Sequence, residues 1–150
     1  MIKGVFVKKL TKYNDDRGWL SEIYRLDELD YSPSMAYVSV TKAGVVRGPH
    51  EHRFQSDCFV FFGPGSFSLH LWDRREGSDT EGEYLELKLG EDEPSLVIVP
   101  PGVVHGYKAL GPGDSYCLNF PDKLYKGEDK KEEVDEIRWE ENPDSPYHIK

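Results

Sequence analysis

The chain has 150 residues, of which 37% are hydrophobic and 13% aromatic, and its formal net charge is −9. This length fits one globular domain with a single core. The acidic balance argues against a nucleic-acid partner, because phosphate binding needs a basic surface stripe. No stretch approaches the ~18 consecutive apolar residues of a membrane-spanning helix, and the first residues lack an apolar leader, so we expect no membrane partner and a cytoplasmic location.

Short segments rich in valine and aromatic residues, separated by turn signals, predict strands along most of the chain. The first two strands are expected at 5–13 and 19–25, on either side of a turn at 14–16. A polar connection follows at 26–34. Later strands are predicted at 36–41, continued across a bend by 45–52, and at 57–62, 66–72, 84–89, 96–99, 107–110 and 115–120.

This pattern of eight or nine short strands without a long helix predicts an all-β antiparallel sandwich or barrel. From Pro121 onward the composition becomes strongly charged, and 130–139 could form one marginal helix. We therefore expect a barrel over 1–125 and a charged tail over 126–150, either a short helix or extended, packed on or beside the barrel as part of one domain.

The segment 48–52, with the sequence Gly-Pro-His-Glu-His, carries the strongest local signal of chemistry. Residues two apart in a strand point to the same face, so the imidazoles of His50 and His52 are expected to converge. Asp57 follows five residues later and would return a carboxylate to the same place. His105 follows a rigid Pro-Pro-Gly turn that would position its side chain.

These four side chains support two interpretations. Three imidazoles and one carboxylate suit Zn, Fe(II), Ni or Mn, so the first interpretation takes His50, His52, Asp57 and His105 as metal ligands. The second takes them as hydrogen-bonded polar groups that line a pocket, since an isolated His-x-His pair is common by chance.

The two histidine segments resemble the paired motifs of the cupin superfamily, which implies a jelly-roll barrel, also described as a double-stranded β-helix. Within that superfamily the chain is most similar to the dTDP-4-dehydrorhamnose 3,5-epimerase family, also called RmlC-like. The similar stretches fall in order over most of residues 3–125, at 16–22, 45–50, 72–78 and 100–107.

Members of that family remove a proton beside a sugar 4-ketone and return it on the other face, which requires a base, an enolate-stabilising group and an acid. The resemblance implies that His50 is the base. It implies that Arg17 and Arg47 contact the nucleotide sugar, since guanidinium binds oxyanions bidentately. It further assigns Glu22 and His105 to the substrate pocket and Asp73 to catalysis. Without the resemblance, Arg17, Glu22 and Asp73 would be expected to form ordinary ion pairs.

Two departures from the family pattern bear on the electrostatics of the site. The family usually has Gln where this chain has His52, and a Lys that stabilises the enolate where this chain has Asp57. An anion at the second position opposes enolate formation unless a metal supplies positive charge. The two changes together restore a metal-binding cupin pattern.

Two further departures concern the acid and the residue that orients the base. Asn119 stands where the family has its tyrosine acid, which leaves Asn119 as a substrate contact and Tyr107 or Tyr116 as candidate acids. The Asp that orients the catalytic histidine is replaced by one of Glu140, Glu141 and Asn142.

Three hypotheses follow from these residues. The first is an epimerase or isomerase of a deoxy-keto-sugar nucleotide in polysaccharide or glycan precursor synthesis, without a cofactor. The second is a metal-dependent cupin of unknown substrate, and the third a non-catalytic sugar-binding cupin. A homodimer is expected on either enzyme hypothesis, because small barrels leave strand edges that a partner can cover, and the family commonly exchanges N-terminal strands.

Overall fold

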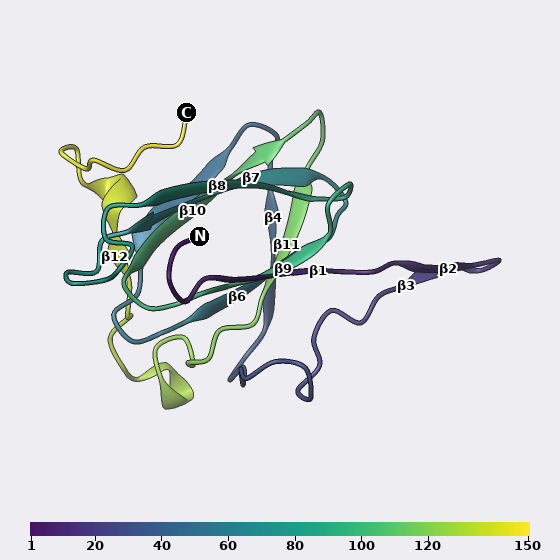
Figure 1. The fold of residues 1–150 in the computed structure, drawn as a ribbon, viewed down its shortest axis with the longest axis horizontal. Helices are drawn as coiled ribbons and strands as arrows, with labels where there is room; N and C mark the ends of the chain where they lie inside the picture. The colour runs from purple at the N-terminus through teal and green to yellow at the C-terminus, as the bar shows by residue number, and fades with distance from the viewer.

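The computed structural model describes all residues 1–150 as two facing five-stranded sheets (Figure 1). The first sheet has the order β1-β9-β6-β11-β4 and the second the order β12-β5-β10-β7-β8, and neighbouring strands pair antiparallel. A separate two-stranded ribbon, β2-β3, projects from one end of the barrel (Figure 1). The strands are β1 (Phe6–Lys9), β2 (Tyr13–Asp15), β3 (Gly18–Leu20), β4 (Tyr37–Thr41), β5 (Val46–Glu51), β6 (Asp57–Phe61), β7 (Ser66–Asp73), β8 (Tyr84–Gly90), β9 (Ser95–Val99), β10 (Val103–Leu110), β11 (Ser115–Asn119) and β12 (Ile137–Arg138).

This architecture confirms the predicted all-β, cupin-type jelly roll. The helix expected within 130–139 is absent; two single 3-10 turns, η1 (Glu128–Lys130) and η2 (Trp139–Glu141), and the strand β12 occupy this region instead. The tail has no apolar stripe that a helix could bury, and β12 instead completes the edge of the second sheet beside β5. No helical segment is long and apolar enough to cross a membrane.

The main core fills the space between the sheets and is built on alternate residues of each strand. In β6 the inward residues Phe59 and Phe61 pack against Tyr107 of β10 and Phe67 of β7, with ring centroids 5.2–5.8 Å apart. Edge-to-face aromatic pairs of this kind add to the free energy of burial. They hold the two sheets at a set spacing.

A second apolar cluster covers the outer face of the first sheet, so β6 is buried on both sides. Cys58 and Val60 of β6 pack there against Leu29 and Tyr31 of the connection between β3 and β4. The Tyr31 hydroxyl donates to the carbonyl of Phe120, 2.7 Å away, which ties this connection to the end of β11. Double burial explains why this strand is a continuous apolar run rather than an alternating one.

Replacing Phe61 by Ala should lower the free energy of unfolding by about 3–5 kcal/mol, because Phe61 is fully buried between the sheets and its loss leaves a cavity. Urea denaturation followed by tryptophan fluorescence measures this change. Phe54→Ala is the control, since Phe54 is largely exposed and its loss should cost little. Equal effects of the two substitutions would contradict the assigned core.

Candidate functional site

The candidate site forms where β5 and β10 approach closely. His50 pairs in register with His105, and their ring centroids lie 4.6 Å apart. Two glycines permit this approach: a Cβ added to Gly106 would lie 2.8 Å from the carbonyl oxygen of Arg47, and one added to Gly48 would lie 2.8 Å from that of His105. The site therefore depends on glycines in both histidine strands as well as on the histidines.

An irregularity in β5 brings Arg47 to the same face as His50. Tyr107 pairs with Arg47 while His105 pairs with His50, so one residue of β10 lies opposite two residues of β5. Directly paired side chains share a face, and Tyr107 belongs to the inner core. The Arg47 guanidinium reaches across to β4 of the other sheet, donating to Thr41 Oγ1 and to the Val40 carbonyl at 2.9 Å.

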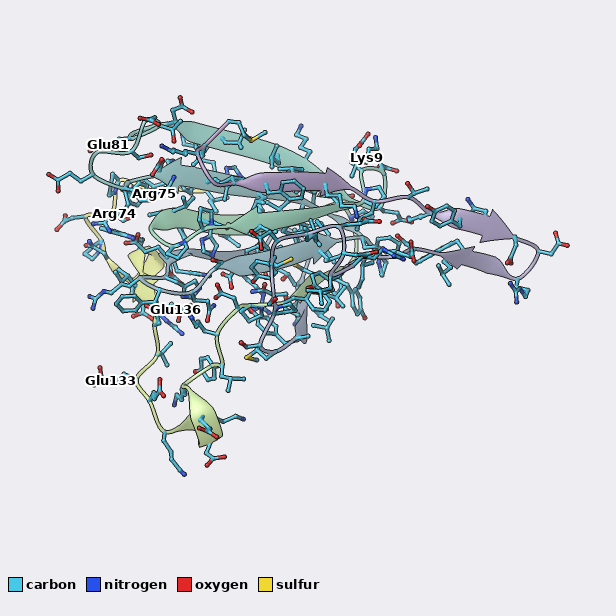
Figure 2. All side chains as sticks on the ribbon, turned by 60° about the horizontal axis from the view of Figure 1, so that its bottom comes forward. Lys9, Arg74, Arg75, Glu81, Glu133 and Glu136 are labelled. Atoms are coloured by element: carbon cyan, nitrogen blue, oxygen red, sulfur yellow. The ribbon has the colours of Figure 1, made fainter.

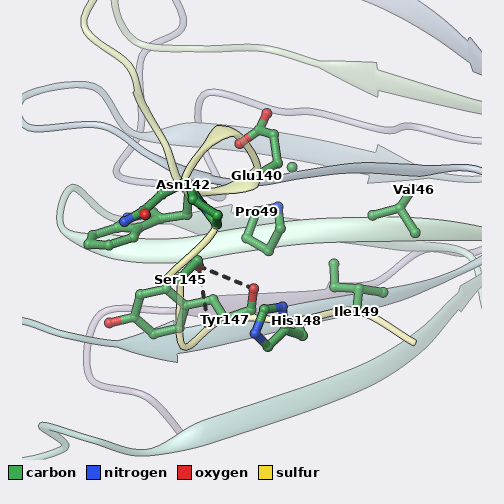
Figure 3. Close-up of a pocket in the computed structure, with 11 residues that line it drawn as sticks. Val46, Pro49, Glu140, Asn142, Ser145, Tyr147, His148 and Ile149 are labelled. Atoms are coloured by element: carbon green, nitrogen blue, oxygen red, sulfur yellow. Dashed lines mark hydrogen bonds between the residues drawn. The ribbon is translucent and has the colours of Figure 1, made fainter.

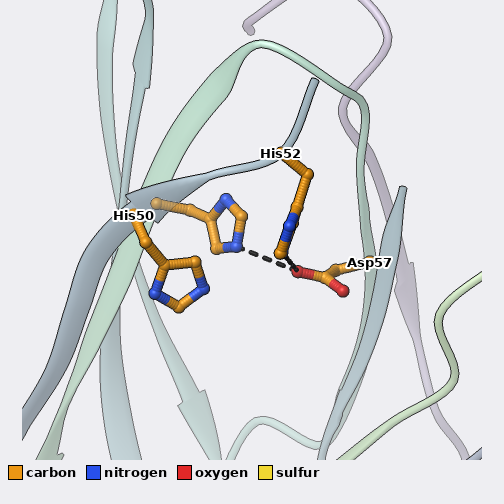
Figure 4. Close-up of side chains that lie close together, drawn as sticks. His50, His52 and Asp57 are labelled. Atoms are coloured by element: carbon orange, nitrogen blue, oxygen red, sulfur yellow. Dashed lines mark hydrogen bonds and ion pairs between the residues drawn. The ribbon is translucent and has the colours of Figure 1, made fainter. Parts of the chain in front are cut away.

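The carboxylate of Asp57 is contacted by two imidazoles (Figure 4). Its Oδ2 is 3.1 Å from His52 Nε2 and 3.0 Å from His105 Nε2. With His50, these side chains form a group whose potential ligand atoms all lie within 4.8 Å of one another. The predicted convergence of the HxH pair, the later carboxylate and the second-motif histidine is therefore what the structure shows.

Burial and mutual contact set the protonation of these groups. Burial and the neighbouring His105 and His52 hold the pKa of His50 well below its usual value. Burial alone would raise the pKa of Asp57, but the hydrogen bonds with His105 and His52 hold it well below its usual range. Burial lowers the pKa of His52, yet the hydrogen bond and charge of Asp57 outweigh it and raise that pKa to about 9. Asp57 is thus an anion and His50 a neutral imidazole at neutral pH.

Asn119 connects the Asp57 carboxylate to Tyr37 of the neighbouring strand β4. Its side-chain oxygen accepts the backbone N–H of Cys58, which leaves its amide nitrogen to donate to Asp57 Oδ1 and to the Tyr37 hydroxyl, each at 2.9 Å. Gln55 donates to the same Asp57 oxygen at 2.9 Å. Sequence reasoning missed Tyr37 and Gln55, although alternation in the strand 36–41 could have placed Tyr37 on one face with Ser39.

The C-terminal tail supplies the carboxylate beside His50. Glu136, just before β12, lies 3.8 Å from His50 Nδ1, and the cross-strand pair of Arg138 with His50 sets this position. The neighbouring Asp135 carboxylate accepts the backbone N–H groups of Arg53, Phe54 and Gln55. The orienting acid was expected at 140–142, and that expectation is wrong for this structure, because the strand pairing brings Glu136 to the histidine.

A hollow of about 340 Å³ lies under the tail, on the outer side of β5 (Figure 3). Glu140 and Asn142 line it together with Val46, Pro49 and Tyr147. The histidine cluster lies on the opposite face of the same strand. Two of the three proposed orienting residues therefore belong to the contact between the tail and the barrel, and the third, Glu141, pairs with Arg138.

Two predicted catalytic residues lie away from the cluster. Tyr116 neighbours the core residue Cys117 on β11 and so points to the outer face, where it is partly exposed. Asp73 is fully buried at the end of β7 and accepts hydrogen bonds from Arg75, Ser78 and Thr80. Figure 2 shows Arg75 and its neighbours Arg74 and Glu81 at the end of the barrel away from the β2-β3 ribbon. Asp73 therefore stabilises a loop, and its assignment to catalysis is not supported.

Two predicted substrate contacts also lie far from the cluster within one chain. Arg17 is at the tip of the β2-β3 ribbon, with an 89% exposed side chain that pairs with Asp15. Glu22 pairs with Arg25 in the exposed connection that follows. The strand predicted over 19–25 ends at Leu20, because no neighbouring strand pairs with the rest of it.

The remaining predicted residues do line the inner face. Arg47, His105 and Asn119 are there, and so is Tyr107, whose hydroxyl lies 3.1 Å from Ser39 Oγ of β4. Burial raises the pKa of Tyr37 to about 12, so both inward-facing tyrosines remain protonated at neutral pH. The inner face of the barrel thus brings imidazoles, a guanidinium and phenols together.

This two-sheet barrel directs histidines from β5 and β10 and a carboxylate from β6 inward. These features define a cupin-type barrel. The family model for dTDP-4-dehydrorhamnose 3,5-epimerase matches residues 1–143 of this chain. The spore coat polysaccharide biosynthesis protein SpsL of Bacillus subtilis is 38% identical over 143 residues, covering 94% of this chain and 92% of that protein. The chain belongs to the dTDP-4-dehydrorhamnose 3,5-epimerase family.

Other relatives agree with this assignment. The probable low-salt glycan biosynthesis epimerase Agl13 of Haloferax volcanii is 38% identical over 135 residues, covering 88% of this chain and 86% of that protein. Among solved structures, a dTDP sugar isomerase of Desulfovibrio desulfuricans superposes with a TM-score of 0.85 at 23% identity, over 98% of this chain and 91% of that one. The latter likeness shows the shared fold.

Replacing Asp73 by Asn should lower the free energy of unfolding by about 1–3 kcal/mol while leaving turnover of a sugar nucleotide unchanged. The carboxylate holds the 73–80 loop and does not touch the cluster. Thermal denaturation and turnover would be measured together, with Glu76→Gln as an exposed control on the same loop. Lost turnover with unchanged stability would restore Asp73 to the catalytic residues.

Proposed function

We propose that this protein is an epimerase of a nucleoside-diphosphate-linked 4-keto-6-deoxy sugar, with His50 as the base that removes the proton beside the ketone. The observation that carries this proposal is the position of His50. Its side chain is 17% exposed, against 9% for His52 and 2% for His105, so it is the imidazole of the cluster that a substrate can reach. A carboxylate, Glu136, lies beside its far nitrogen.

The chemistry of His50 follows from this setting. A neutral imidazole can accept a proton from carbon, and burial among other histidines keeps His50 neutral. The Glu136 carboxylate, 3.8 Å from Nδ1, stabilises the imidazolium that forms after the proton is taken. A base activated in this way needs an acid across the sugar ring to complete inversion.

Tyr37 is the best-placed acid. Its hydroxyl oxygen accepts a hydrogen bond from Asn119, so the phenolic proton remains free to be donated. Asn119 stands at the position of the family's tyrosine acid and pairs in register with Tyr37 on β4. The phenol missing from β11 is therefore supplied by the directly opposite residue of the neighbouring strand.

Arg47 lies on the same inner face as His50 and is proposed to contact the diphosphate or the sugar. Its two hydrogen bonds to β4 hold the guanidinium between the two sheets, and a planar guanidinium can bind phosphate oxygens bidentately. The relatives SpsL and Agl13 are named for polysaccharide and glycan biosynthesis. We propose that the product of this protein serves the same kind of pathway.

We further propose a homodimer in which the β2-β3 ribbon of one subunit completes the site of the other. The ribbon projects from the barrel (Figure 1). It carries exposed apolar side chains beside Arg17. A second exposed apolar strip lies on the outer face of β4 and β11. Exposed apolar side chains that lie together are typical of an interface between proteins. The two surfaces comprise Tyr13, Trp19 and Leu20 on the ribbon, and Val38, Val40 and Tyr116 on the strip.

Incubation with dTDP-4-keto-6-deoxyglucose in D₂O tests the proton chemistry directly. The wild-type protein should incorporate deuterium beside the ketone, and NMR identifies the carbon. His50→Ala should lose about 10²–10⁴-fold in this rate, the usual contribution of a general base. Tyr37→Phe should keep deuterium exchange but form epimerised product more slowly.

Tyr116→Phe is the matched control for Tyr37→Phe, since Tyr116 lies on the paired strand but faces outward. It should behave as the wild type in both readouts. No deuterium incorporation by the wild-type protein would contradict the epimerase proposal. Normal exchange in His50→Ala would contradict the choice of base.

Mixing two inactive variants tests the shared site. Arg17→Ala and His50→Ala dimers each lack one required group, but a mixed dimer has one site with both groups intact. After dissociation and reassociation, about a quarter of wild-type turnover should return, since half of the dimers are mixed and each has one working site. Unrestored turnover after verified mixing, or a compact monomer in solution scattering, would contradict this arrangement.

A further inference from the structure

The hydrogen bonds around Asp57 fix which nitrogen of two histidine rings carries a proton. His105 Nδ1 is 2.9 Å from the carbonyl oxygen of Val103, and His52 Nδ1 contacts the carbonyl oxygen of Asp135. A carbonyl oxygen only accepts hydrogen bonds, so both Nδ1 atoms carry their proton. Each Nε2 can then donate to a carboxylate only if its ring carries a second proton and is an imidazolium cation.

Both of these Nε2 atoms point at the same acceptor, Asp57 Oδ2, at 3.1 Å for His52 and 3.0 Å for His105. The other carboxylate oxygen, Oδ1, is satisfied by amide donors from Asn119 and Gln55. Two imidazole nitrogens and one carboxylate oxygen thus converge on one buried point. Protons alone satisfy both contacts only if two imidazolium cations lie side by side, whereas one divalent cation between the three atoms satisfies both contacts with neutral rings.

We propose that His52, His105 and Asp57 bind one divalent transition-metal ion of the Zn²⁺, Fe²⁺, Mn²⁺ or Ni²⁺ class. Two imidazoles and one carboxylate on one side of an ion form a common protein site for such metals and leave positions open for other ligands. Imidazoles that ligate a metal almost always donate their other N–H to a carbonyl or carboxylate, as both of these rings do.

His50 lies on the open side of this proposed site. Its ring centroid is 4.6 Å from that of His105 and 5.5 Å from that of His52, while its Nδ1 faces Glu136. This leaves His50 free for the proton transfer of the proposed function. A bound ion would supply positive charge beside a keto oxygen. In this chain Asp57 stands at the position where the family usually has a cationic lysine. Epimerases of the family generally need no cofactor, so the site would distinguish this protein from them.

Metal binding can be measured without any substrate and so independently of the proposed epimerase activity. The full chain would be stripped with a chelator, dialysed, and titrated with Zn²⁺ by calorimetry, with elemental analysis of the untreated protein alongside. We expect about one equivalent per chain, with binding weakened at least about tenfold in His52→Ala, His105→Ala and Asp57→Asn. Asp57→Asn keeps the side-chain shape if the alanine variants fail to fold.

Two control variants sharpen the result. His70→Ala removes a buried histidine held by Tyr84 and Ser68, away from the cluster, and should bind Zn²⁺ as the wild type does. His50→Ala should also keep the ion while losing proton exchange. Co²⁺ titration should give visible absorption bands of a nitrogen- and oxygen-ligated ion in these two variants and lose them in His52→Ala.

Three outcomes would overturn the proposal. The first is a wild-type protein that binds no Zn²⁺ in the titration. The second is an adventitious ion only, recognised by equal binding in the wild type and in folded His52→Ala, His105→Ala and Asp57→Asn. The third is loss of the ion from His50→Ala, which would overturn the three-ligand assignment. None of these depends on whether the protein turns over a sugar nucleotide.

Discussion

One buried carboxylate organises the interior of this protein. Asp57 is 1% exposed between two sheets, and an ionised group in such a place is tolerated only with partners on each oxygen. Its neighbours come from β10, from β11 and from the loop between β5 and β6, so satisfying one charge requires segments of both sheets at set distances. The close approach at Gly48 and Gly106 serves the same requirement, because the ring of His52, just after β5, and the ring of His105 in β10 meet at this charge.

The charge of Asp57 helps to explain two departures from the family pattern, at Asp57 itself and at Asn119. A carboxylate in place of a lysine would be repelled by a keto oxygen, but the same carboxylate gathers two imidazoles whose outer nitrogens are bound to backbone carbonyls. The loss of a tyrosine on β11 is matched by Tyr37 on the directly paired strand, joined through Asn119. Under the proposed function, these paired changes belong to a site adapted to altered chemistry.

Local pattern was sufficient for most of the fold and for the centre of the site. Strand alternation placed His50 and His52 on one face, and the turn before His105 indicated the second motif. The predictions that failed, or that the sequence could not make, depend on contacts between distant segments of the chain. Arg47 shares a face with His50 only because a strand irregularity adds a residue, and Glu136 reaches His50 only through the pairing of β12 with β5. The place of Asp73 in the family motif could not show that its carboxylate is hydrogen-bonded within its own loop.

The tail anchored by Asp135 has a consequence for how the protein is made. During synthesis, residues 1–125 emerge before the tail, and they contain every strand except β12. The barrel can therefore close around Asp57 while the backbone N–H groups of 53–55 and the outer nitrogens of His50 and His52 still lack their partners. Residues 135 and 136 provide all of these contacts at once. A nascent chain would thus acquire its fold first and the complete set of contacts around its histidines only with the tail.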